Sequence, residues 1–219
     1  MTAALFESVA RIARHEAGAR ATAGIGKVVD LFPADGALKD HAVSVEMIAT
    51  GLVLPKCPVA VGSMGYAAIP SVDDLVLVVF LDGDSNAGVV AGRIYHPDLE
   101  PPQHKRDQIV LALPAGSDPP DLSLLITSTE PSIELKLPGD VSLVLEQGKV
   151  TVTVDQIKFS LDSAGGGRAE LAAGGSKLTL KQDGDITVQS AGKLVLKGTE
   201  VEIEGTGKVK VQGAVVEIN

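Results

Sequence analysis

A short repeated unit fills the last third of the chain and limits what this chain can fold into. In most copies two apolar residues flank one polar residue, and a glycine-containing turn precedes the next copy. The first residues of the clearest copies fall at 178, 186, 194, 201, 209 and 216, so the steps are 8, 8, 7, 8 and 7 residues. Alternation with a period of two predicts strands with one dry and one wet face. Glycine suits the bends between them because it has no Cβ.

One short strand and one corner make too small a unit for a full coil of a single-chain β-helix, which needs several faces per turn. The unit predicts instead one face of a triangular prism, in which three copies of the chain wind round a common axis. The apolar positions would form the dry interior of this trimer. The predicted trimer core consists of Leu178, Leu180, Ile186, Val188, Leu194, Leu196, Val201, Ile203, Val209 and Val211.

An ordinary antiparallel meander or sandwich would produce the same alternation. The near-constant step favours the prism, because meanders rarely keep such a step over so many strands. Less regular units precede the clear ones from Leu122 onward, and a glycine-rich stretch at 163–168 interrupts them once, which predicts a loop at one corner. We therefore assign residues 122–219 to a trimeric β-helix spike.

The upstream part of the chain predicts a small β-barrel at residues 21–97. Its five strands are expected at 25–32, 41–49, 57–62, 74–81 and 88–95, with turn residues between them. The OB-fold is the common five-stranded barrel. Residues 4–17, within an N-terminal segment 1–20, predict a short amphipathic helix, and the proline-rich stretch 98–121 predicts a connector that contains a strand at 109–113. The predicted fold class is all-β.

Composition excludes several other classes of protein. A formal net charge of −9 argues against nucleic acid as a partner, because phosphate binding needs clustered Lys and Arg. The N-terminus lacks the pattern of a signal peptide, and no run of 18 apolar residues predicts a transmembrane helix. We therefore expect synthesis in the cytoplasm and, if the protein leaves the cell, export by another route. The single Cys57 excludes an intrachain disulfide.

Motifs for catalysis or metal binding match only weakly. Asp82, Asp84 and Asn86 imitate the start of an EF-hand loop, but Ala87 stands where that loop requires Gly. The four histidines, at 15, 41, 96 and 104, lack metal-ligand spacing. The sequence therefore predicts no enzyme, no cofactor and no metal site.

A stretch in the middle of the chain carries a family resemblance. Residues 67–84 contain a proline, a short acidic turn, a valine-rich strand ending in Phe80 and a Gly-Asp turn, and residues 88–95 end in Gly92-Arg93-Ile94-Tyr95. This pattern resembles the OB-domain signature of contractile-tail spike proteins. That family includes phage baseplate assembly protein V, the VgrG spikes of type VI secretion and the spikes of extracellular contractile injection systems.

The resemblance implies a homotrimeric structural spike within an assembled phage tail or injection device. Its OB domain would sit on the baseplate hub under the tail tube, and the prism would point outward, puncture the target envelope mechanically and touch the membrane only transiently. No lysozyme-like insertion is present, so wall hydrolysis is not implied. No hub domain precedes the OB unit, which implies a separate hub protein.

The resemblance also suggests a partner at the tip. Some family members close the prism with paired histidines that bind a metal ion, and this chain has no histidine after His104. We therefore expect a small PAAR-repeat tip protein on the last residues, which are Val215, Val216, Glu217, Ile218 and Asn219.

Two other functions stay open. A trimeric fibre that binds a receptor or a glycan should end in a globular head, whereas this sequence ends in strand repeats. An OB-type ligand-binding protein should bind an oligonucleotide or a sugar, which a titration would reveal.

Overall fold

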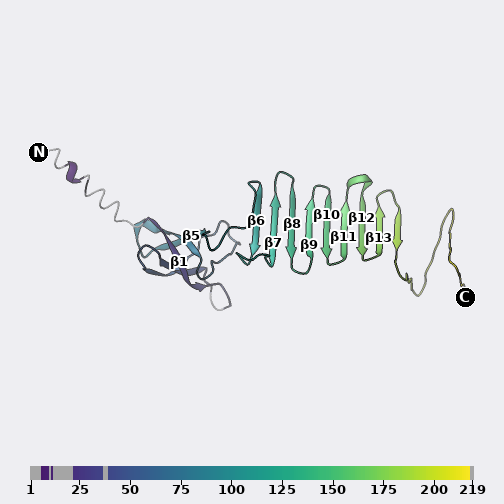
Figure 1. Ribbon diagram of the computed structural model, residues 1–219, viewed down its shortest axis with the longest axis horizontal. Coiled ribbons are helices and arrows are strands. Elements are labelled where there is room, and N and C mark those ends of the chain that lie inside the picture. Colours follow the sequence, from purple (N-terminus) through teal and green to yellow (C-terminus); the bar gives the residue numbers. More distant parts are fainter. Residues whose placement is uncertain (1–5, 10, 12–21, 37–38, 218–219) are drawn as a thin grey trace. The chain divides into compact units, whose positions relative to one another are not determined.

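The computed structural model describes residues 6–9, 11, 22–36 and 39–217 (Figure 1). The fold is all-β, as predicted. The chain divides between Pro101 and Pro102 into two compact units, which we describe separately. Residues 6–9 and 11 are helical, and the remainder of the helix predicted at 4–17 lies outside the described residues. No helix in the described part of the chain is long and apolar enough to cross a membrane.

The first unit is a five-stranded antiparallel sheet with the strand order β3-β2-β1-β4-β5. A parallel bridge between Val59 and Val90 connects the chain after the third strand to the fifth, and so brings the two edges of the sheet together. The order is therefore that of a small closed barrel. The strands are β1 (Ala23–Phe32), β2 (Ala42–Met47), β3 (Val53–Pro58), β4 (Leu75–Phe80) and β5 (Gly88–Ile94).

Valine side chains fill the barrel. Val28, Val43 and Val76 are fully buried and belong to one core cluster with other aliphatic residues of the five strands. Bulges interrupt the pairing of β1 with β2, of β2 with β3 and of β4 with β5. Because a bulge bends its strand and increases the local twist, these irregularities help to curve the sheet round its valine core.

Four of the five strands lie within two residues of their predicted bounds, but the third does not. It was predicted at 57–62 and is found at Val53–Pro58. This strand contains Pro55 and ends at Pro58, and proline disfavours a central strand. However, β3 lies at the edge of the sheet, where one side of the strand has no neighbour. A proline there removes no hydrogen bond from the middle of the sheet. Edge position, which a single sequence does not reveal, explains the shift.

The second unit contains a nine-stranded antiparallel sheet within its described residues (Figure 1). Strands follow each other in space as they do in the chain, and their register runs without a bulge from the first pair to the last. The sheet is a plain meander. Its strands are β6 (Gln108–Leu113), β7 (Leu122–Thr127), β8 (Ser132–Leu137), β9 (Val141–Glu146), β10 (Lys149–Val154), β11 (Ile157–Asp162), β12 (Arg168–Ala173), β13 (Ser176–Lys181) and β14 (Ile186–Gln189).

This meander corrects the prediction of an intertwined prism for part of the range 122–219. From Leu122 to Gln189 each strand pairs with its neighbours in the same chain, not with strands of other copies. Connections as short as the two residues between β9 and β10 return the chain at once and close hairpins. These strands therefore form the ordinary antiparallel meander that was the alternative to the prism. The strand predicted at 109–113, inside the expected connector, is confirmed as β6 and opens the sheet.

The turns along both edges of this sheet continue its hydrogen bonding. At one edge, Ser163 N donates to Gly148 O at 2.8 Å and Gln182 N donates to Gly167 O at 3.0 Å. At the other edge, Asp155 N donates to Asp140 O at 3.2 Å. Successive turns therefore stack on each other as the strands do. The glycine-rich interruption at 163–168 contains the 3-10 turn η2 (Ala164–Gly166) between β11 and β12.

Residues 190–217 are extended but form no strand (Figure 1). The strands predicted at 194–196, 201–203 and 209–211, and the described part of the one at 216–218, are absent from the single chain. A strand is defined by its ladder of hydrogen bonds, and this segment has no partner strand among the residues that the structure describes.

Candidate functional site

One face of the nine-stranded sheet is almost entirely aliphatic. The pairing register aligns one apolar residue from every strand in a central column. It consists of Leu111, Leu124, Leu135, Leu143, Val152, Phe159, Leu171, Leu178 and Val188. A second unbroken column beside it consists of Ile109, Ile126, Ile133, Leu145, Val150, Leu161, Ala169, Leu180 and Ile186. We call this surface the aliphatic face.

Within the second unit, no described residue covers the aliphatic face. Every buried apolar side chain among the described residues belongs to the first unit, and the second unit contributes none. Ile109 at one end of the sheet is 68% exposed, and Ile186 at the other end is 67% exposed. The sheet thus has all the residues of a hydrophobic core but no second layer to pack against.

The aliphatic face is larger than the apolar patches that are usual on soluble monomers. Nine strands at about 4.8 Å spacing and six residues at about 3.4 Å each give a surface of roughly 800 Å². The largest apolar patch on a soluble monomer is usually about 300–600 Å², and larger ones mark interaction surfaces. Burying one aliphatic side chain contributes about 1.5–3 kcal/mol, so covering this face contributes tens of kcal/mol before entropy is subtracted.

The opposite face is mostly polar and carries charge pairs between neighbouring residues. Glu170 on β12 lies between two cations, with Arg168 Nη1 at 3.6 Å and Lys177 Nζ at 3.1 Å. Lys136 Nζ lies 2.9 Å from Glu134 Oε1 on β8. Exposed pairs of this kind contribute little to stability, about 0–1 kcal/mol each. These charges do indicate which face of the sheet contacts water. The polar face is suited to solvent, and the aliphatic face is the one that remains to be covered.

The predicted trimer-core residues fall into two groups. Leu178, Leu180, Ile186 and Val188 lie together on the aliphatic face. The other six lie in the extended segment, where their side chains are exposed; they are Leu194, Leu196, Val201, Ile203, Val209 and Val211. Sequence analysis missed that the same face extends back to β6, although the alternation of Ile109, Leu111 and Leu113 carries that signal.

The predicted tip residues are only partly described. Val215, Val216 and Glu217 are exposed, with Val215 at 77%. Ile218 and Asn219 lie outside the described residues.

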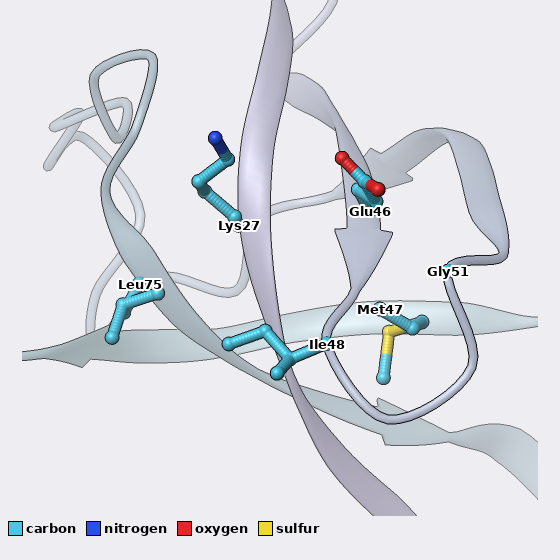
Figure 2. Close-up of a pocket in the computed structure, with 6 residues that line it drawn as sticks. All are labelled: Lys27, Glu46, Met47, Ile48, Gly51 and Leu75. Atoms are coloured by element: carbon cyan, nitrogen blue, oxygen red, sulfur yellow. The ribbon is translucent and has the colours of Figure 1, made fainter.

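The barrel has a small hollow of about 260 Å³ on its surface. Figure 2 shows Lys27 and Glu46 in the upper part of the hollow and the apolar side chains of Met47, Ile48 and Leu75 below them. Lys27 is already engaged, because its Nζ lies 3.1 Å from Asp73 Oδ1. The hollow therefore offers a small apolar floor with a charged rim, and it holds no arrangement of nucleophile and base.

The EF-hand-like motif of Asp82, Asp84 and Asn86 forms a turn between β4 and β5. Asp84 Oδ1 accepts hydrogen bonds from the backbone and side-chain nitrogens of Asn86, at 2.8 and 3.2 Å, so it is engaged in its own loop. Across the described ranges, no group of three or more His, Cys, Asp or Glu side chains is placed to hold a metal ion. Burial raises the pKa of the Cys57 thiol, which lies in the barrel core.

Comparison with known proteins identifies the barrel. Residues 25–95 match the family described as the type VI secretion system/phage-baseplate injector OB domain. The match spans the strands from β1 to β5, begins inside β1 and ends directly after β5. It supports the baseplate spike family in general and a baseplate-related structural role. A search of curated proteins found no match.

Proposed function

We propose that this protein is the structural spike of a contractile injection machine and acts as a homotrimer. The observation that carries the proposal is the order of the two units: a baseplate-injector OB domain is followed by a sheet whose aliphatic face needs cover. An OB domain of this family supports attachment to a baseplate hub. The long one-sided sheet supports a rod made from several copies.

Three copies suit the sheet better than two for a geometric reason. Each strand from β6 to β14 is six residues or fewer, so the aliphatic face is only about 20 Å wide. Three such faces, each packed against the other two, enclose a narrow triangular core that aliphatic side chains can fill. The nearly constant 7–8-residue step beyond Gln189 fits the same three-sided cross-section, with one corner per step.

In this proposal the protein works mechanically. The OB domains dock on a separate hub protein, and the rod is driven through the target envelope when the machine contracts. A tip protein of the PAAR-repeat type would cover the exposed Val215 and Val216. That partnership predicts capture of such a protein by the intact spike and loss of capture when Val215 and Val216 are both changed to Asp.

Mass in solution is the first test. The trimer has an expected mass of 3 × 22.5 = 67.5 kDa. Light scattering at micromolar concentration should return that mass and keep it on dilution. A monomer would overturn the proposal, and a dimer of 2 × 22.5 = 45 kDa would replace the three-sided rod with a two-sheet sandwich. A second test is biological: without this protein, the source organism should assemble no contractile particles able to inject.

A further inference from the structure

The outer side of the barrel carries an apolar strip along β1 and β4. Outward residues of the two strands pair directly, with Ile25 opposite Leu77 and Ala23 opposite Val79. All four are exposed, whereas the outward positions of a half-solvated antiparallel sheet are normally polar. We call the outward side chains of residues 23, 25, 75, 77 and 79 the barrel wall.

The hollow described above continues the barrel wall. Leu75 belongs to both, and Ile48, which lines the hollow, donates its backbone N–H to Ile25 O at 3.1 Å. The wall and the floor of the hollow therefore form one apolar surface, on which Ile48 is 62% exposed. The usual ligand face of an OB-fold lies on its second and third strands, so this surface on β1 and β4 is separate from it.

A second uncovered apolar surface precedes β1 in the chain. It is the stripe of the helix predicted at 4–17, which consists of Leu5, Phe6, Val9, Ile12 and Ala13. Residues 6–9 are helical, and the side chains of Phe6 and Val9 are exposed, Phe6 to 76%. A short helix gains most of its stability from packing its apolar stripe against another element.

We propose that the N-terminal helix packs along the barrel wall of its own chain, with Phe6 in the hollow and Val9 over Ile25. The inference concerns a single chain and does not depend on the proposed trimer. It requires the helix to run antiparallel to β1, so that its last turn lies near Ala23 and its first turn near the hollow.

The connection between the helix and the barrel is short enough to keep the two surfaces together. Thr22 O accepts a hydrogen bond from Phe80 N at 3.1 Å, which fixes the end of the connection beside the Val79 end of the wall. If the helix ends at Ala17, residues 18–22 connect it and span at most about 17 Å. That length is sufficient to reverse the chain, and a short tether gives an effective concentration in the millimolar range.

The lengths of the two surfaces agree. The helix from Phe6 to Ala17 is about 16 Å long at 1.5 Å per residue. The wall from Ala23 to Lys27, where the hollow lies, is about 14 Å long. A helix that starts from the tether and lies on the wall therefore brings Phe6 to the hollow. The hollow of about 260 Å³ is larger than the roughly 150 Å³ that hold a benzene-sized ring.

The charges of the two parts are complementary. Residues 1–21 contain three arginines and two glutamates, a charge of +1, whereas residues 22–101 contain four cations and ten carboxylates, a charge of −6. At the rim of the hollow Lys27 pairs with Asp73, and Glu46 forms no ion pair with any described residue. The proposed direction places the N-terminus of the helix near Glu46, and a carboxylate is favourable at that end of a helix.

Disulfide trapping in the full-length chain tests the docking. Val9→Cys with Ile25→Cys places two thiols on facing surfaces, so oxidation should close a bond within one chain. The expected result is loss of both thiols in a product of single-chain size on a denaturing gel. Arg11→Cys with Ile25→Cys is the matched control and should keep its thiols, because Arg11 lies on the other side of the helix. The native Cys57 is 3% exposed and is shielded from reaction.

Three outcomes of this trapping would overturn the inference. Free thiols in the pair at positions 9 and 25 would mean that the helix does not lie on the wall. A covalent product of two or more chains would mean that the helix packs on another copy. Equal reaction in the test pair and the control pair would mean that the helix presents no fixed face to the barrel.

A tryptophan reporter provides a second readout, because the sequence contains no Trp. Phe6→Trp should emit at a shorter wavelength than a Trp in water and should be quenched less by acrylamide. Adding Ile48→Asp places a charge in the hollow and should return the emission to that of an exposed Trp. Ile48 lies outside the barrel core, so the melting temperature of the barrel should change little. Solvent-like emission from Phe6→Trp alone would overturn the inference, and so would emission that Ile48→Asp leaves unchanged.

Discussion

Ser163 donates its backbone N–H to the carbonyl oxygen of Gly148 at 2.8 Å, although these residues belong to different turns. The turn between β9 and β10 thus lies directly beside the turn between β11 and β12. Gly148 has a φ of 76°, and a Cβ added there would overlap Ser163 Oγ. The left-handed backbone therefore favours glycine at this position, and a Cβ would in addition displace the hydroxyl of Ser163.

The variant Gly148→Ala should melt below the parent protein, and Gly139→Ala is its control. Gly139 has a φ of 77° but no atom within 4 Å of an added Cβ. The control bears only the cost of the left-handed backbone, about 1–2 kcal/mol, whereas Gly148→Ala must also move Ser163. Thermal unfolding should place both variants below the parent and Gly148→Ala slightly below Gly139→Ala, because the displaced Ser163 hydroxyl can rotate away. Equal melting temperatures of the two variants would mean that the Ser163 hydroxyl moves away from the added Cβ at no cost.

A charge on the aliphatic face should prevent assembly, whereas a charge on the other face should not. Leu143 lies in the central aliphatic column of β9, and Ser142 is its neighbour on the polar face. Leu143→Asp would place one buried carboxylate per copy in the shared core, at a cost of several kcal/mol each. Light scattering should give a reduced mass for Leu143→Asp and the parent mass for Ser142→Asp. Similar losses in both variants would mean that the two faces have been assigned wrongly.

A cavity in the barrel should weaken the first unit without changing the number of copies. Val76 is fully buried in the valine core, so Val76→Ala removes two methyl groups from a packed site and should cost about 1–3 kcal/mol. Denaturant unfolding should show a lower midpoint for the barrel, and the mass in solution should stay that of the parent. A change in mass would mean that the barrel itself carries the association.

The start of the meander should respond to acid. Hydrogen bonds from Thr129, first from its side chain, lower the pKa of the Asp107 carboxyl below its ordinary value of 3.8. A lowered pKa in the folded protein means that the ionised carboxylate stabilises the fold at pH values above that ordinary pKa. The contribution disappears as the pH falls through the lowered pKa. Thr129→Val should therefore unfold at a lower urea concentration than the parent at neutral pH, and the gap should close as the pH falls below the ordinary value. A gap that stays constant with pH would show that the carboxylate is not involved.

The alternation in the sequence predicted the faces of the strands but not their partners. Leu178 and Leu180 were assigned to a dry face, and the register places them there. Whether Leu178 pairs with a strand of its own chain depends on the turns, because a period of two is identical in both arrangements. In the barrel, the position of β3 depended on its place at the edge of the sheet, which is a property of the whole fold and not of Pro55 itself.

The aliphatic face itself could have been traced further back from the sequence. Ile109, Leu111 and Leu113 alternate as clearly as the later strands do, but the prolines around them indicated a connector. Proline marks where a strand begins and ends as readily as where structure is missing, and Pro114 directly follows the last residue of β6. The unpaired state of residues 190–217 could not have been predicted, since their local pattern continues that of β13 and β14.

The order of the meander gives the sheet different resistance to pushing and to pulling. Its strands lie across the row from β6 to β14, and the hydrogen bonds between them point along it. A compressive load along the row presses each strand onto the next and shortens bonds that are already made. A load in the opposite direction peels the last strand away, and then the one before it, breaking only a few bonds at a time. In the proposed spike, such a sheet would suit a single forward thrust and would unravel easily on withdrawal.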